Sequence, residues 1–189
     1  GRVSLDLGQL QARLDDVVIK SNISELSWDD IRETFAPVAA SGITAVDGDL
    51  TVTVSQAILS EQGAPVLTAL LDFINGKLAV SSLKEEIRNI ELHAEYSNQN
   101  LEIFKSSLEI GKGRIDVNGG VNDVLGAQNF ELDLNFKDLQ LSNFVPDVHP
   151  EIHPVALLNG KTHMKGTGFD PQKMLNSLQG QVEVGVTEA

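Results

Sequence analysis

The sequence predicts a mainly β fold: a curled antiparallel meander sheet that forms an apolar groove or a sandwich, with two short helices. Apolar and polar residues alternate through much of the 189 residues, which is the period of half-buried strands. A short phrase around a glycine recurs along the chain. Aromatic residues make up only 5% of the chain, so Leu, Ile and Val must supply whatever surface it buries.

The recurring phrase is an apolar residue, one spacer, a glycine, a polar residue and then a strand-like alternation. Its copies are centred on Gly48, Gly76, Gly160 and Gly180. Glycine after Asp or Asn tolerates positive φ, so each copy is interpreted as a tight turn that begins a strand. Repeated turn-plus-strand phrases predict a sheet built hairpin by hairpin.

The first 42 residues give mixed signals. Alternating Val3, Leu5 and Leu7 predict a strand, whereas residues 10–19 fit either a helix or a second strand. Ser27 is a suitable N-cap for a short helix over residues 28–36, which Pro37 would end.

Alternation from Gly48 onward predicts a series of strands. They cover residues 50–54, 90–96, 101–103, 108–110, 115–117 and 130–141. Residues 65–74 fit a helix or a strand, and we favour a strand that enters an Asn75-Gly76 hairpin. Polar turns are expected at residues 97–100, 111–113 and 118–120.

Prolines make residues 146–154 a predicted connector. A second helix should follow, with Asp170 as N-cap, Pro171 at its first position and an apolar stripe of Met174, Leu175 and Leu178. Gly180 lies past its end, and alternating valines predict a last strand over residues 182–186.

Charge and composition exclude several classes of function. The net charge of −13 argues against nucleic-acid binding and against permanent contact with an anionic membrane surface. Without cysteine there are no disulfides, thiolate nucleophiles or iron–sulfur clusters. No apolar run approaches the roughly 18–20 residues of a transmembrane helix, and no signal peptide is present. Because the alternation of apolar and polar residues that predicts a strand is already present at the start of the sequence, we interpret the chain as part of a longer protein.

Two motifs superficially suggest chemistry. His149 and His153 flank Glu151 at a spacing that could bind zinc on a helix, but Pro150 interrupts them and the segment is a predicted connector. Asn159-Gly160-Lys161-Thr162 matches the end of a phosphate-binding loop, yet the position of its first glycine holds Val155 and a strand follows. We therefore predict neither a metal site nor a cofactor.

The carboxylates do not form a catalytic pattern. Nearly all of them alternate with apolar residues on predicted strands, which indicates a solvated sheet face, and no G-x-S-x-G motif is present. An enzyme that acts on a polymer would need converging carboxylates in a cleft. We predict that the chain is not an enzyme.

The remaining candidate site is the apolar side of the strands. One interpretation is a sandwich core under a second sheet or the helices, which alternation alone favours, and the other is a concave face left open to hold acyl chains. The candidate lipid-binding residues are Leu50, Val52, Ile90, Leu92, Leu101, Ile103, Leu108, Ile110, Ile115, Val117, Phe130, Leu132, Leu134 and Phe136.

Glycines and alternation together resemble the AsmA-like family of bacterial envelope proteins. The matching segments are Ile74-Asn75-Gly76-Lys77-Leu78, residues 90–96, 101–110, 113–119 and 130–141, Leu158-Asn159-Gly160-Lys161, Gly166-Thr167-Gly168 and residues 175–182. The resemblance covers residues 43–189 as a β-groove region, and residues 1–42 form an unplaced N-terminal segment with a strand and a helix.

The resemblance implies an inner-membrane anchor, absent from this chain, and a periplasmic β-groove that carries phospholipid between the inner and outer membranes. Members of the family are also associated with outer-membrane protein assembly, and no catalytic residues are implied. We therefore expect a periplasmic segment that binds phospholipid. The alternative is an interaction module that adds a strand of an outer-membrane assembly partner to a sheet edge.

Overall fold

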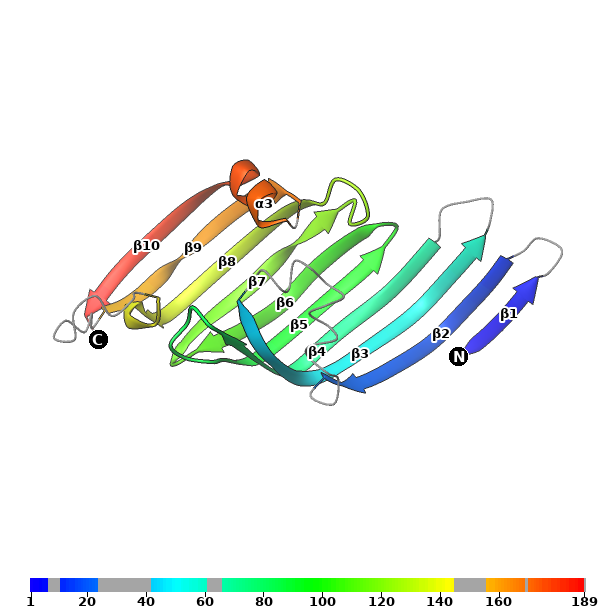
Figure 1. Cartoon of the computed structure of the whole chain (residues 1–189), viewed down its shortest axis with the longest axis horizontal. Coiled ribbons are helices and arrows are strands. Elements are labelled where there is room, and N and C mark those ends of the chain that lie inside the picture. Colours follow the sequence, from blue (N-terminus) through cyan, green and yellow to red (C-terminus); the bar gives the residue numbers. More distant parts are fainter. Residues whose placement is uncertain (7–10, 24–41, 61–65, 145–155, 169, 189) are drawn as a thin grey trace.

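A computed structural model describes residues 1–6, 11–23, 42–60, 66–144, 156–168 and 170–188. They form one ten-stranded antiparallel sheet whose spatial order follows the chain from β1 to β10 (Figure 1). The strands are β1 (Arg2–Asp6), β2 (Gln11–Asn22), β3 (Ile43–Ser60), β4 (Val66–Val80), β5 (Ile87–Ser97), β6 (Asn100–Ile110), β7 (Gly113–Asn122), β8 (Asn129–Gln140), β9 (Ala156–Thr167) and β10 (Gln179–Glu188). The predicted mainly β meander is confirmed.

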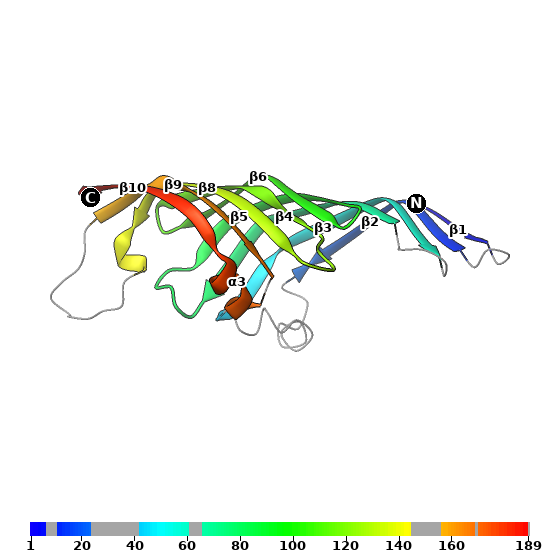
Figure 2. The same cartoon turned by 90° about the horizontal axis from the view of Figure 1, so that it is seen from above.

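The sheet curls without closing, and β1 and β10 are its two edge strands. Figure 2 shows the strands bending to one side, with the 3₁₀ turn η2 (Leu141–Asn143) and the helix α3 (Pro171–Ser177) on the concave side. The ambiguous segment at residues 10–19 belongs mostly to β2. Since β2 pairs with β3, residues on both sides of position 42 share one sheet.

Bulges bend the strands. Asn75, Asn89, Lys105 and Asp138 have positive φ within strands, and the pairing register shifts beside each of them. A bulge inserts one unpaired residue, which bends its strand and increases the local twist. Such bulges on β4, β5, β6 and β8 bend these strands and contribute to the curl of the sheet.

The glycine phrases lie inside strands, so their interpretation as tight turns is wrong. Gly48, Gly76 and Gly160 fall within β3, β4 and β9, and Gly180 is the second residue of β10. The predicted Asn75-Gly76 hairpin is wrong for the same reason, since β4 continues to Val80. Asparagine with positive φ serves a bulge as readily as a two-residue turn.

The other local predictions have mixed outcomes. Residues 98–99 and 111–112 do form turns between strands, but residues 118–120 lie within β7 and do not form the expected turn. The segment at residues 65–74 is mostly strand, as favoured. The predicted helix at residues 28–36 and the connector with His149 and His153 lie outside the described residues.

The C-terminal helix is confirmed. The backbone N–H of Lys173 donates to Oδ1 of Asp170 at 3.1 Å, which is the expected N-cap hydrogen bond. The helix ends at Ser177, one residue before Leu178, the last member of the predicted apolar stripe. A Cβ atom at Gly166 would lie 3.1 Å from Oγ of Ser177, so this end of α3 lies over the side of the sheet to which Gly166 faces.

Candidate functional site

Strand pairing places all the predicted lipid-binding residues on one face of the sheet. Directly paired residues share a face, and the pairs Val52–Leu71, Leu71–Ala94, Ala94–Ile103, Ile103–Gly119, Val117–Leu134 and Phe130–Gly166 connect this face from β3 to β9. We call it the apolar face. Since Gly166 belongs to it and α3 covers Gly166, the apolar face is the concave side seen in Figure 2.

Several residues of the apolar face were not among the predicted ones. They include Leu71, Phe73 and Leu78 of β4, Val54 and Ala94 of the neighbouring strands, and Val182, Val184 and Val186 of β10. Alternation of Leu67, Ala69, Leu71 and Phe73 was the available signal for β4.

The apolar face is covered only in part. Two buried clusters lie on it, one around Val54 and Ala69 and the other around Ile110 and Leu139. Among the described residues no large side chain is less than 2% exposed, and Ile110, at 3%, is one of the most buried. The strands that the structure describes make a single layer, so no second sheet covers this face as a sandwich requires.

The apolar face carries no charge across its central strands. On β4 to β9 every side chain of this face is uncharged, and the polar ones are Tyr96, Ser106 and Thr162. Ser106 is buried, and its Oγ accepts a hydrogen bond from the backbone N–H of His93 at 2.9 Å. Thr162 donates to the backbone O of Gln181 at 3.1 Å. Both groups therefore make their hydrogen bonds within the sheet, and the surface remains apolar.

Phenylalanine rings lie over glycines of the same face. A Cβ atom on Gly48 or on Gly76 would collide with the ring of Phe73. Phe136 and Phe130 occupy the corresponding space above their paired residues Gly160 and Gly166. An aromatic ring over a glycine fills the gap that the missing side chain leaves and pins the register. The recurring glycines thus give these rings room to lie against the sheet.

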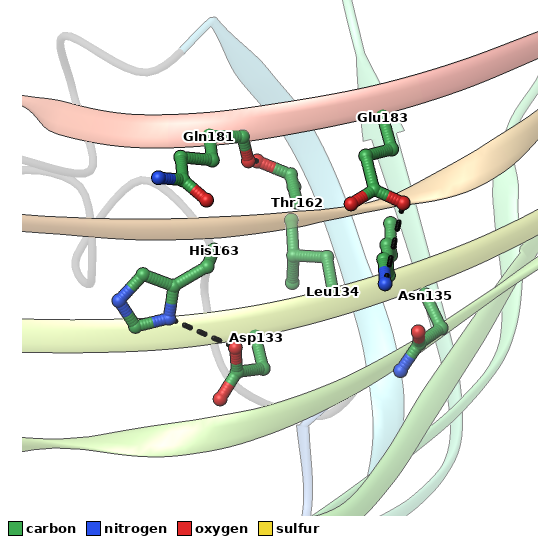
Figure 3. A pocket seen from close by; sticks show the side chains of 8 residues that line it. Asp133, Leu134, Asn135, Thr162, His163, Gln181 and Glu183 are labelled. Atoms are coloured by element: carbon green, nitrogen blue, oxygen red, sulfur yellow. Dashed lines mark hydrogen bonds and ion pairs between the residues drawn. The ribbon is translucent and has the colours of Figure 1, made fainter.

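Charged side chains gather on the opposite, polar face. A hollow of about 340 Å³ lies there, and Asp133 of β8, His163 of β9 and Gln181 of β10 are among its lining residues (Figure 3). Nδ1 of His163 lies 2.9 Å from Oδ1 of Asp133, and Nζ of Lys161 lies 3.2 Å from Oε2 of Glu183. These side chains are 42–73% exposed, so the pairs contribute little to stability and form a solvated surface.

A further polar cluster connects β2, β3 and β4. The carboxylate of Asp49 accepts hydrogen bonds from Nδ2 of Asn75 at 3.0 Å and from Nδ2 of Asn22 at 2.9 Å. These two bonds, the one from Asn75 first, lower the pKa of Asp49 below its ordinary value because they stabilise the charged form. The cluster links neighbouring strands at the bulge of β4.

The described part of the chain contains no group of three or more His, Asp or Glu side chains placed to hold a metal ion. Within the same ranges, no helix is long and apolar enough to cross a membrane. Comparisons with protein-family models, with curated proteins and with solved structures each find no match to this chain.

Proposed function

We propose that the apolar face binds the acyl chains of phospholipid. The observation that carries the proposal is a concave face without charge across β4 to β9, which no second layer covers in the described part of the chain. The two buried clusters occupy only part of the apolar face, and the hydrophobic side chains packed against them are half-buried. An extended apolar surface of this kind marks an interaction site in a protein that is otherwise acidic.

Binding would depend on the hydrophobic effect alone. Each methylene that leaves water for this face contributes about 0.8 kcal/mol, regardless of its position along the face. Leu, Ile and Val offer no directional bond that would hold a chain at one place, so an acyl chain can slide along the strands. The charged headgroup stays at the open, polar edge of the sheet, because no buried charge on the apolar face could pair with it.

The cellular role follows from the resemblance of residues 43–189 to the AsmA-like family. We propose a periplasmic segment of a protein that is anchored in the inner membrane and carries phospholipid between the inner and outer membranes. The sheet supports this role through its open curl, which leaves a path along which a lipid could pass. Passive transfer of this kind needs neither a cofactor nor a catalytic residue.

Extraction and mass spectrometry test the proposal. Purified chain, treated with organic solvent, should release phospholipid at a fixed ratio to protein. Leu134→Lys places a charge on the apolar face, and Asn135→Lys places the same charge on the neighbouring residue of the polar face. Leu134→Lys should lose most of the bound phospholipid and Asn135→Lys should retain it. A wild-type chain that is free of lipid, and that takes up none from phosphatidylglycerol vesicles, contradicts the proposal.

A further inference from the structure

The two ends of the strands carry different polar groups. An antiparallel meander gathers alternate connections at the same end of its sheet. Residues 81–86 and 111–112 therefore lie at one end with η2, and residues 98–99 and 123–128 lie at the other end with α3 (Figure 1). We call these the η2 end and the α3 end. β7, which has 10 residues, separates them by about 30 Å.

The η2 end holds a buried hydrogen-bond donor without a partner. Asn143, in η2, is 4% exposed. Among the described residues, its Nδ2 atom is the one buried side-chain nitrogen or oxygen that makes no hydrogen bond. An unsatisfied donor is unfavourable, so an acceptor oxygen supplied by a ligand would be stabilising there. One backbone hydrogen bond, from the N–H of Phe144 to the O of Leu141 at 3.0 Å, closes this turn, so a small shift of η2 opens the amide to a ligand.

The η2 end borders the apolar face. Leu139, which shortly precedes η2 in the chain, belongs to the buried cluster around Ile110, and Leu83 of the connection at residues 81–86 packs against this cluster. A Cβ atom at Gly113 would lie 2.7 Å from the Cα of Leu139, so the turn at residues 111–112 is close by. Since the cluster lies on the apolar face, a polar group bound at this end can remain joined to acyl chains on the face.

Charged groups of both signs surround this end. Lys84, Glu85 and Glu86 lie in one connection, and Lys112, which is exposed, lies in the next. A Cβ atom at Gly111 would lie 2.6 Å from Oε2 of Glu85, so the two connections are neighbours in space. A headgroup that carries a phosphate and an amine would find a group of opposite charge for each of them.

The α3 end offers less to such a headgroup. The carboxylates of its described connections already bind backbone N–H groups of their own turns, Asp123 at 2.7 Å and Asp170 at the start of α3. Lys173 is the one cation of these connections, whereas the described connections of the η2 end hold two. Leu125, in the turn between β7 and β8, is 70% exposed. The α3 end is therefore the less polar of the two.

We propose that a phospholipid lies on the apolar face with its headgroup at the η2 end and its acyl chains directed towards the α3 end. Nδ2 of Asn143 then donates to a phosphate or ester oxygen, and the ammonium group of Lys112 pairs with the phosphate. The inference rests on the proposed function, since it concerns how the same lipid is held. Asn143 and Lys112 position the headgroup, and the apolar face binds the chains.

Paramagnetic broadening of NMR signals from the full chain tests the orientation. A phosphatidylcholine with a nitroxide on its headgroup should broaden the backbone amide signals of Leu83 and Lys112 and spare those of Val124 and Leu125. A nitroxide near the end of an acyl chain should broaden Leu125 more than Lys112. Equal broadening of both ends by the headgroup label, or stronger broadening at the α3 end, overturns the proposed orientation.

The same spectra separate this inference from the proposed function. Broadening of the Ile103 methyl signal by the acyl label would still support binding to the apolar face if the headgroup label appeared at the wrong end. Absence of broadening by either label would contradict both proposals.

Uptake of phosphatidylcholine from vesicles tests the role of Asn143. Asn143→Leu removes the donor with little change in volume and should weaken binding by about three- to tenfold. Asn122→Leu makes the same change at an exposed position near the α3 end and should bind as wild type does. Thermal unfolding without lipid separates binding from folding, because loss of an unsatisfied donor should leave Asn143→Leu at least as stable as wild type. Equal affinity of the two variants overturns the role of Asn143.

A charge-matched pair of variants tests the role of Lys112. Lys112→Gln removes a cation at the η2 end and should weaken uptake severalfold, whereas Lys173→Gln removes one at the α3 end and should have no effect. The difference should decrease as salt is added, since the pair is exposed to solvent. A larger loss of uptake for Lys173→Gln than for Lys112→Gln would place the headgroup at the other end and overturn the proposal.

Discussion

The backbone N–H of Asp138 in β8 donates a hydrogen bond to Oδ1 of Asn159 in β9, at 3.0 Å. The same arrangement occurs between β6 and β7, where the N–H of Lys105 donates to Oδ1 of Asn118, also at 3.0 Å. Asp138 and Lys105 are both bulge residues with positive φ. At a bulge the backbone ladder is interrupted, and an asparagine of the next strand supplies the missing acceptor.

Removing this acceptor should destabilise the sheet. Asn159→Ala leaves the N–H of Asp138 without its acceptor, and we expect a loss of about 1 kcal/mol in the free energy of unfolding. Asn159→Asp keeps an oxygen at the same place and should lose less. Asn135→Ala, an exposed position on β8, is the control and should leave the urea midpoint unchanged. Equal midpoints for Asn159→Ala and Asn135→Ala would refute the role of this hydrogen bond.

Two glycines of adjacent strands should respond in opposite ways to alanine. A Cβ atom at Gly160 would collide with the backbone O of Glu183, whereas one at Gly185 would lie 3.7 Å from the O of Asn159. Gly160→Ala should cost roughly 1–3 kcal/mol of stability because β10 must move away. Gly185→Ala should be neutral or slightly stabilising, since alanine loses less backbone entropy on folding. Thermal unfolding of the two variants measures the difference, and a stable Gly160→Ala variant would contradict the close approach of β9 and β10.

The Asp49 cluster makes part of the stability dependent on pH. Its hydrogen bonds lower the pKa of the folded state, so the contribution is present above the ordinary value of 3.8 and is lost as pH falls through the folded pKa. Wild type should therefore exceed Asp49→Asn in stability at pH 6, and the difference should shrink below pH 3.8. Urea titrations across this range test it. If the stability difference between wild type and Asp49→Asn grew as the pH fell, the result would contradict a lowered pKa for Asp49.

Alternation alone predicted most of the strands and the membership of the apolar face. Residues 130–136 are the clearest case, since Phe130, Leu132, Leu134 and Phe136 share one face of β8 as expected. A period of two residues fixes which face a side chain occupies once a strand is accepted. This part of the site could therefore be predicted without knowing how the strands pair.

Bulges and layering could not be predicted in the same way. Asn75-Gly76 satisfies the dihedral requirements of a hairpin and of a bulge alike, and pairing of Gly76 with Ile90 and of Leu78 with Ile87 decides for the bulge. These partners are distant in sequence, so no local signal reveals them. Alternation also does not reveal whether the apolar face is covered, because a covered sheet and an uncovered one need the same pattern of apolar and polar residues.

Methyl NMR with a spin-labelled phospholipid tests the central claim most directly. Ile103 and Ile115 lie on the apolar face, and Ile74 lies on the polar face at 42% exposure, which makes it an internal control. A phosphatidylcholine that carries a nitroxide near the end of one acyl chain should broaden the δ1 methyl signals of Ile103 and Ile115 and spare that of Ile74. Unchanged signals for Ile103 and Ile115, or equal broadening of all three, would contradict binding of acyl chains to the apolar face.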